Sequence, residues 1–169
     1  RDLRMDDNAS LHLALTNSDV VQPIFIFDST ILNNLPTDDK RVLFIYQEVS
    51  KLKEKYQELG SDLLVYYGDP SVLIPQICSE FSANALFANR DYEPYGLARD
   101  KAIYTSLKER NVDFRAKKDH VIFEKDEILK GDGTPYTIFT PYSNKWKEKV
   151  NSFYLKSYPT EKYFDRLIK

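Results

Sequence analysis

The chain has 169 residues, of which 42% are apolar and 30% charged, and its formal net charge at neutral pH is −2. This length suits one domain with its own core, and the composition excludes a disordered chain or a membrane span. The slightly acidic balance argues against a domain whose main partner is a nucleic-acid backbone, because such binding needs a basic face.

The first part of the chain predicts alternating helices and strands. Asn8 is placed to cap a short helix that runs to about Asn17. A near-continuous apolar run then indicates a buried strand over 20–27. A connector over 32–37 leads to a long helix over 38–59, and a second strand follows over 63–67.

The second part continues the alternation. Pro70 stands at the first position of a helix over 70–81, which is followed by a strand over 85–88. A loop then leads to a helix over 96–110 and a strand over 113–116. Ser143 is placed to cap a last helix over 143–155.

This order predicts an α/β domain, because strand–helix–strand units join parallel strands through right-handed crossovers. Ligands of such sheets gather beyond the carboxyl ends of the strands. The segments there are Asp28 onward, Gly68–Asp69–Pro70 and the loop 89–95.

Residues for catalysis and metal binding are not evident. The glycine-rich phosphate-binding motifs and the serine nucleophile elbow are absent from the sequence. His12 and His120 lack ligand-like neighbours, and Cys78 lies in an apolar helical stripe typical of packing. A single cysteine also excludes an internal disulfide and favours a reducing, cytoplasmic setting. We therefore predict no catalytic residue and no metal site.

The loop 89–100 combines three acids, two bases and two tyrosines directly after a buried strand. Aromatic faces stack on planar heterocycles, and carboxylates accept hydrogen bonds from ring N–H or ribose hydroxyl groups. In the alternative interpretation, Glu93 and Asp100 cap the next helix while Tyr92 and Tyr95 pack on its first turn. The residue types alone leave both interpretations open.

Four motifs, in order, resemble the DNA photolyase and cryptochrome family. They are the opening Arg1-Asp2-Leu3-Arg4-Met5-Asp6-Asp7-Asn8, the turn Gly68-Asp69-Pro70 followed by Leu73-Ile74-Pro75, the loop Asn89 to Asp100, and the stretch Gly133 to Tyr142. The resemblance implies that residues 1–169 form the amino-terminal α/β domain, a three-layer, Rossmann-like domain. Its mostly parallel five-stranded sheet would carry helices on both faces.

In that family a carboxyl-terminal helical domain, absent from these residues, holds the catalytic FAD and binds UV-damaged DNA. The resemblance therefore implies a flavoprotein lyase that uses light to repair pyrimidine dimers, with this domain inactive alone and lacking a DNA surface. The expected partners are the FAD-binding domain and, through it, DNA, with no membrane. The alternatives are a cryptochrome that signals without repair and a stand-alone nucleotide-binding α/β protein.

The family's amino-terminal domain seats an antenna chromophore in many members. The positions that match its deazaflavin or flavin pocket are Arg1, Phe25, Arg41 and Asp91, with Asp38, Val42 and Glu93 nearby. Phe25 would stack on the ring or belong to the core, Asp91 would accept a hydrogen bond, and the arginines would meet polar or anionic groups. Folate-binding members use an Asn-Glu pair where this chain has Tyr95-Gly96, so the resemblance favours a deazaflavin or flavin.

The family pattern also places an apolar strand before Arg1, in the middle of the sheet. Without it, two strands would each leave one edge unpaired. We therefore expect upstream residues, another segment or another chain to fill this position.

Overall fold

The structure is a computed structural model that describes residues 2–169; Arg1, one of the predicted antenna ligands, lies outside the described residues. The helices are α1 (Ala9–Asn17), α2 (Ser29–Leu32), α3 (Lys40–Glu58), α4 (Pro70–Glu80), α5 (Pro94–Glu109) and α6 (Phe139–Lys149), with 3-10 helices η1 (Lys125–Glu127) and η2 (Thr160–Arg166). The strands are β1 (Ile24–Asp28), β2 (Leu64–Gly68), β3 (Ala85–Asn89) and β4 (Asp113–Lys117).

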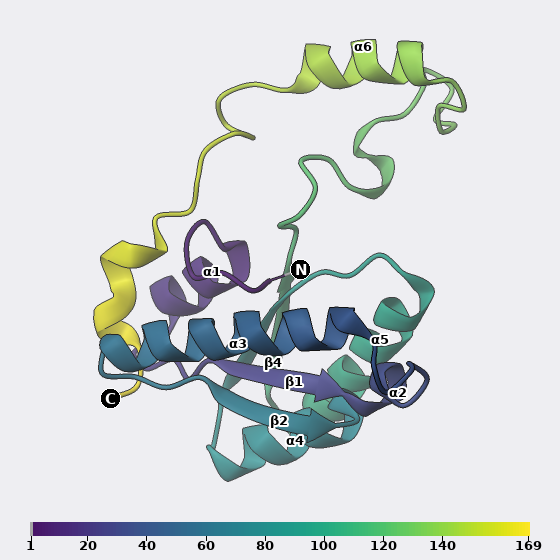
Figure 1. The fold of residues 1–169 in the computed structure, drawn as a ribbon. Coiled ribbons are helices and arrows are strands. Elements are labelled where there is room, and N and C mark those ends of the chain that lie inside the picture. The colour runs from purple at the N-terminus through teal and green to yellow at the C-terminus, as the bar shows by residue number, and fades with distance from the viewer. Residues whose placement is uncertain (1) are drawn as a thin grey trace.

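The expected α/β fold with parallel strands is confirmed, but the described strands form two pairs instead of one sheet. β1 pairs in parallel with β2, with Ile24 opposite Leu64, and β3 pairs in parallel with β4, with Ala85 opposite Asp113. Figure 1 shows α3 over the β1–β2 pair, with α4 on the opposite face. Helices therefore cover both faces, as predicted.

The core is divided in the same way as the strands. One buried cluster gathers around α1, α3 and η2 and consists of Met5, Leu15, Val49, Leu52, Tyr56, Leu63 and Leu167. The other lies between α4 and α5 and consists of Cys78, Ile103 and Leu107, with Leu86 and Phe114 packed against it. Globular domains usually have one contiguous core, so this division is unusual.

The predicted start of β1 was wrong, and one short helix was missing from the prediction. β1 begins at Ile24, not at Val20, because Val21 forms a bridge to Leu167 and Pro23 follows it. The sequence pattern missed α2, which Asp28 caps by accepting a hydrogen bond from the Thr30 N–H at 2.9 Å.

The last helix does not begin at Ser143. It runs over Phe139–Lys149, and Pro141 lies in its first turn, where the missing proline N–H breaks no helical hydrogen bond. Val150 is extended and ends it, so the predicted continuation to Leu155 is also wrong.

The amino-terminal motif has a structural role at the end of β3. Asp119, with a side chain only 1% exposed, pairs with Arg4 at 2.6 Å and accepts a 2.9 Å hydrogen bond from the Ala9 N–H. The Asn89 side chain accepts from the Ser10 N–H and donates to Oδ1 of Asn8. These bonds fix the first turn of α1 against the carboxyl end of β3.

Residues between η1 and η2 extend away from the rest of the molecule, and α6 forms the far end of this excursion (Figure 1). None of the residues of α6 is buried. The chain then returns, and the buried Thr160 donates to the Met5 carbonyl at 2.7 Å.

Candidate functional site

The carboxyl ends of β1 and β3 meet at one edge of the molecule. β1 ends at Asp28, and the loop that follows β3 leads into α5, whose Tyr95 hydroxyl donates to Oδ2 of Asp28 at 2.6 Å. Figure 1 shows α2, the start of α3 and the start of α5 at this same end. This is the edge where the fold class predicts a ligand.

Tyr95 and its neighbours form the polar part of this edge. Burial and the hydrogen bond to Asp28 raise the pKa of the Tyr95 phenol above its ordinary value. The Arg99 guanidinium lies 5.9 Å from the centroid of the Tyr95 ring and donates to Asp100 at 2.8 Å. The phenol is therefore neutral at physiological pH and lies beside a delocalised cation.

Asp91 and Glu93 lie in the loop that precedes α5. Oδ1 of Asp91 accepts hydrogen bonds from the N–H groups of Tyr92 and Glu93, at 2.7 and 3.2 Å. Glu93 occupies the N-cap position of α5 without a side-chain capping bond. Asp91 thus stabilises the turn itself, and the capping role considered for Glu93 is not observed.

Gly96 is required by the position of Asp91. A Cβ atom on Gly96 would lie 2.5 Å from Cγ of Asp91, which is closer than real contacts allow. The small residue therefore lets the carboxylate fold back over the first turn of α5.

The predicted residues Asp38, Arg41 and Val42 lie at the start of α3. Arg41 donates to the N-cap residue Asp39 at 2.5 Å, and this hydrogen bond is the largest cause that lowers the pKa of Asp39 to about 2. Arg41 is largely exposed, so it could exchange this carboxylate for an anionic ligand group. Val42 is half-buried and Asp38 is exposed.

Phe25 contacts the core instead of standing free at this edge. It packs against the cluster that contains Tyr56 and Leu52, and its ring meets that of Phe27 edge-on at 5.0 Å. The same residue also lines a cavity between β1 and β3. The structure therefore brings Phe25 into core packing, while the other described candidates lie in two groups, at the starts of α3 and α5.

Sequence reasoning did not identify a second ionic cluster behind the loop. Glu124 accepts hydrogen bonds from Arg90 at 2.5 Å and from the Tyr92 hydroxyl at 2.6 Å. Burial and the bond to Glu124 raise the pKa of Tyr92. Because Glu124 lies far along the chain, no local spacing predicts this contact.

Exposed apolar side chains surround the carboxyl edge. They come from α2, the first half of α3 and β2, and they are Ile31, Leu43, Phe44, Tyr46 and Tyr67. The Tyr67 hydroxyl donates to Asn33, just after α2, at 2.7 Å. Aromatic rings beside hydrogen-bonding groups are typical of sites for planar heterocycles.

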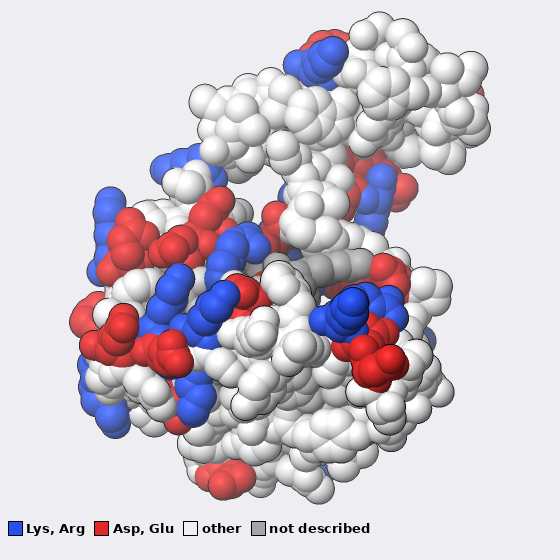
Figure 2. Space-filling view, in the orientation of Figure 1, with Lys and Arg blue, Asp and Glu red and all other residues white. Residues whose placement is uncertain are grey.

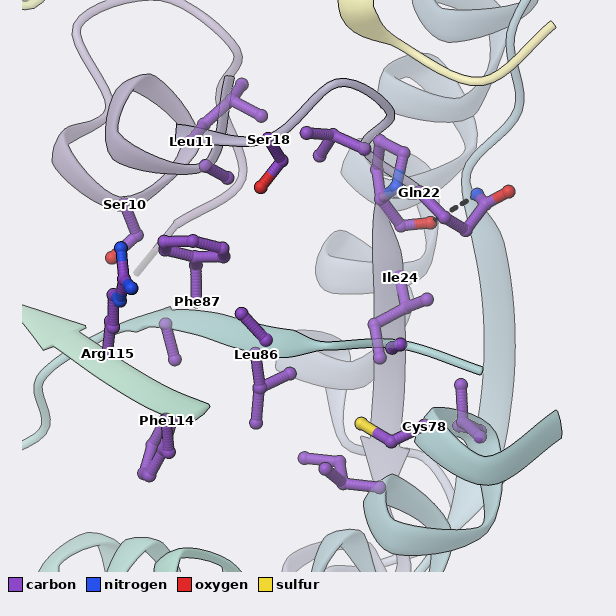
Figure 3. Close-up of a pocket in the computed structure, with 18 of the residues that line it drawn as sticks. Ser10, Leu11, Ser18, Gln22, Ile24, Cys78, Leu86, Phe87, Phe114 and Arg115 are labelled. Carbon is purple, nitrogen blue, oxygen red and sulfur yellow. Dashed lines mark hydrogen bonds between the residues drawn. The ribbon is translucent and has the colours of Figure 1, made fainter. Parts of the chain in front are cut away.

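A cavity of about 1010 Å³ separates the two strand pairs. Figure 3 shows Ile24 of β1 and Leu86 and Phe87 of β3 around it, with Cys78 of α4 also in its lining. Asp28, Asn89, Arg99 and Asp100 lie at its carboxyl end. The cavity thus reaches the polar edge described above.

The surface gives further constraints. Figure 2 shows acidic and basic side chains interspersed on one face, without a continuous basic area among the residues drawn in colour or white. Within residues 2–169, no cluster of three or more His, Cys, Asp or Glu side chains could hold a metal ion. No described helix is long and apolar enough to cross a membrane.

Comparison with known proteins identifies a match along nearly the whole chain. The family model described as DNA photolyase matches residues 1–162. A deoxyribodipyrimidine photo-lyase of Synechococcus sp. is 35% identical over 147 residues, which are 87% of this chain and 30% of that protein. Cryptochrome-2 of Gallus gallus is 29% identical over 133 residues, which are 79% of this chain and 23% of that protein.

The fold also matches a solved structure. An archaeal photolyase from Sulfolobus tokodaii superposes with a TM-score of 0.77 at 28% identity, covering 89% of this chain and 34% of that one. That structure is described as holding two FAD molecules and as implying a novel light-harvesting cofactor. The chain thus spans about a third or less of the length of these relatives.

Proposed function

The chain belongs to the DNA photolyase family, and we propose that it forms the amino-terminal, antenna-binding domain of a deoxyribodipyrimidine photo-lyase. In this proposal, FAD and UV-damaged DNA bind to a carboxyl-terminal domain that continues the polypeptide. The whole protein uses light to split pyrimidine dimers, and residues 1–169 alone have no repair activity. The short share of the photo-lyase relative that this chain covers supports this division.

The observation that carries the antenna role is the edge formed by Asp28, Tyr95 and Arg99, which is flanked by exposed aromatic rings. This set suits a planar chromophore with a polar or anionic chain. Exposed rings such as Phe44 provide apolar contact, the Tyr95–Asp28 pair offers donors and acceptors, and Arg41 and Arg99 offer positive charge. A deazaflavin or flavin fits this donor set.

Such a chromophore, when bound, supplies light absorption and passes excitation energy to the FAD. The chain's own residues would hold and orient it. Tyr95 would keep its place through Asp28, Asp91 would maintain the turn before α5, and Arg41 would leave Asp39 to meet the ligand. The second FAD of the Sulfolobus tokodaii photolyase supports a flavin in this role.

A binding experiment tests the antenna role. The 169-residue chain is titrated with 8-hydroxy-5-deazaflavin, FMN and FAD, and ligand fluorescence and the melting temperature are followed. We expect one of the three to be quenched and to raise the melting temperature, and Arg41→Ala to weaken its binding. Failure of all three at saturation would contradict the proposal, and Lys51→Ala, on the exposed side of α3, is the matched control.

A second candidate is a cryptochrome that signals without repair, which the similarity to cryptochrome-2 of Gallus gallus favours. The full-length protein distinguishes the two in an assay for light-dependent repair of cyclobutane and (6-4) dimers. We expect repair of one of these lesions. A protein that holds FAD and repairs neither lesion would support the cryptochrome instead.

A further inference from the structure

β2 has an open edge on the side away from β1. Among residues 2–169, β2 pairs only with β1, and no residue of β2 lines the cavity between the strand pairs. The Leu64 N–H donates to the Pro23 carbonyl at 3.1 Å, on the β1 side. Consecutive residues of a strand direct their backbone groups to opposite sides, so those of Val65 and Tyr67 face the open side. Each of these two residues therefore offers one donor and one acceptor there.

The sequence of β2 does not protect this edge against pairing. Edge strands of natural proteins commonly carry charged residues or proline, which prevent pairing with other chains. β4, which pairs only with β3, follows this rule with Asp113, Arg115 and Lys117. β2 reads Leu-Val-Tyr-Tyr-Gly and has neither a charge nor a proline. Its edge is therefore suited to accept a further strand.

Apolar side chains are exposed beside this edge, on the face that carries α3. Tyr67 lies opposite Phe27 in the β1–β2 register, and Val65, two residues earlier, points to the same face. The Tyr46 ring of α3 lies 6.5 Å from the Phe27 ring. Leu43 precedes Tyr46 by three residues and lies on the same side of α3. These four exposed side chains, here called the β2 patch, are Leu43, Tyr46, Val65 and Tyr67, with exposed fractions of 58, 60, 40 and 62%.

The β2 patch offers the area that a weak dimer needs. A buried aromatic side chain contributes about 200 Å², so Tyr46 and Tyr67 together offer roughly 240 Å² in each copy. With Leu43, Val65 and the strand backbone, two copies together bury about 1,000 Å², which is the lower bound for a specific interface. The area therefore favours a reversible dimer over a permanent one.

A second copy of β2 fits the edge in antiparallel orientation. With Tyr66 on a two-fold axis, Val65 lies opposite the partner's Tyr67, and Tyr67 lies opposite the partner's Val65. The backbone groups of both residues face outward, so each of these opposed pairs exchanges two hydrogen bonds. An aromatic ring beside a β-branched side chain is also a favourable cross-strand pair. The strand is thus complementary to itself.

The charges next to β2 do not oppose this pairing. In the same register, Asp62 lies opposite the partner's Pro70. Asp69 lies opposite the partner's Leu63, so the two carboxylates do not face like charges across the strands. Lys53 also binds Asp62 at 2.5 Å. Figure 2 shows an uncharged area over the lower part of the molecule, where Figure 1 places β2 and α4.

We propose that the open edge of β2 and the β2 patch form the interface of a homodimer, in which two β2 strands pair antiparallel about a two-fold axis at Tyr66. The outward backbone groups, the unprotected edge and the patch together specify a second copy as the partner. The dimer goes beyond the antenna role and does not depend on it. Asp28 and Tyr95 lie outside the patch, and Phe44, two residues before Tyr46, points to another side of α3.

Sedimentation velocity of the 169-residue chain over a concentration series tests the dimer. We expect a reversible equilibrium between a species of 19.8 kDa and one of twice that mass. Val65→Lys should weaken association by about tenfold or more, because a lysine protects a strand edge. Val20→Lys is the matched control, since Val20 is an exposed valine outside the strands. Unchanged association of Val65→Lys, folded by circular dichroism, would overturn the proposal.

A disulfide tests the register of the two strands. Directly opposed residues of a non-hydrogen-bonded antiparallel pair have Cα atoms about 4.5 Å apart, which a disulfide can span. Tyr66→Cys, in a Cys78→Ser background, should therefore cross-link two copies on mild oxidation. Leu64→Cys is the control, because it points to the same face but lies about 13 Å from its counterpart along the strands. Equal cross-linking of the two variants would contradict the register.

Hydrogen exchange gives a third measurement, which does not depend on a substitution. The amides of Val65 and Tyr67 should exchange more slowly as the protein concentration rises. The Tyr66 amide faces β1 in both states and should change little. The proposal is overturned if the chain remains monomeric at its highest soluble concentration, or if association protects β1 and β3 instead of β2. A failed flavin titration would leave all three measurements unaffected.

Discussion

The hydroxyl of Tyr95 donates a 2.6 Å hydrogen bond to Oδ2 of Asp28, although 67 residues separate them in the chain. The same carboxylate caps α2 through the Thr30 N–H. One buried side chain thus joins β1, α2 and α5 at the edge where the antenna is proposed to bind. Both ends of this contact can be changed without altering the backbone.

Tyr95→Phe should lower the free energy of unfolding by about 1–2 kcal/mol, because it leaves the buried Asp28 carboxylate with one donor fewer. The partial exposure of Tyr95 keeps the loss below that of a fully buried bond. Urea denaturation measures it. Tyr104→Phe, a similarly exposed tyrosine of the same helix, is the control and should change stability little. Equal effects of the two substitutions would show that the bond does not stabilise the fold.

Gly96→Ala should destabilise the protein by about 1–3 kcal/mol, because the added Cβ forces Asp91 to move. Gly131→Ala is the control, since no atom lies within 4 Å of its Cβ position. The cost of Gly96→Ala should also be smaller in an Asp91→Ala background, and a double-mutant cycle measures this coupling. Additive effects would contradict the proposed clash.

Asp119→Ala should cost about 1–3 kcal/mol, because the Asp119 side chain is buried and its loss removes the acceptor of the Ala9 N–H and the partner of the partly exposed Arg4. Asp113→Ala breaks an exposed ion pair with Arg115 and should cost at most about 1 kcal/mol. Thermal unfolding, monitored by circular dichroism, compares the loss of stability in the two variants. A larger loss for Asp113→Ala would refute the structural role of the amino-terminal motif.

Alkaline pH should destabilise the protein through Tyr56. Burial raises the pKa of this phenol, whose ordinary value is 10.0. In the unfolded chain it ionises near that ordinary value while the folded form keeps its proton, so stability is full below pH 10 and falls above it. Tyr56→Phe should reduce the stability lost between pH 8 and pH 11 by about 1 kcal/mol.

Urea titrations at both pH values, with the exposed Tyr46→Phe as control, measure this difference. An identical pH dependence in the parent and in Tyr56→Phe would exclude Tyr56 as a cause of the alkaline loss.

Local pattern predicted most of the fold. The strands around Phe25, Tyr66 and Leu86 and the helices between them follow from apolar runs and capping residues, because those signals act over a few residues. The predicted start of α6 was wrong because this segment contains both Ser143, which is suited to an N-cap, and Pro141, which is equally suited to the first turn of a helix. The local sequence does not include the tertiary contacts that decide which of the two begins the helix.

The sequence predicted less of the candidate site than of the fold. The sequence singles out the loop after β3 as a dense group of polar and aromatic residues, but it does not predict that the partners of Tyr92 and Tyr95 are Glu124 and Asp28, far along the chain. Phe25, for which stacking on the ring and core packing were both open, packs against the core. Such pairings depend on how the strands are ordered in space, which periodicity does not report.

The excursion that carries α6 leaves the body after the ion pair between Lys118 and Glu127 and returns at Thr160, which is bonded to Met5. Because both ends are anchored, the excursion is a closed loop in the polymer sense. The entropy of closing such a loop changes only with the logarithm of its length, by about 0.6 kcal/mol per doubling. Evolution could therefore lengthen or shorten the α6 segment to suit a neighbouring surface with little effect on the stability of the body.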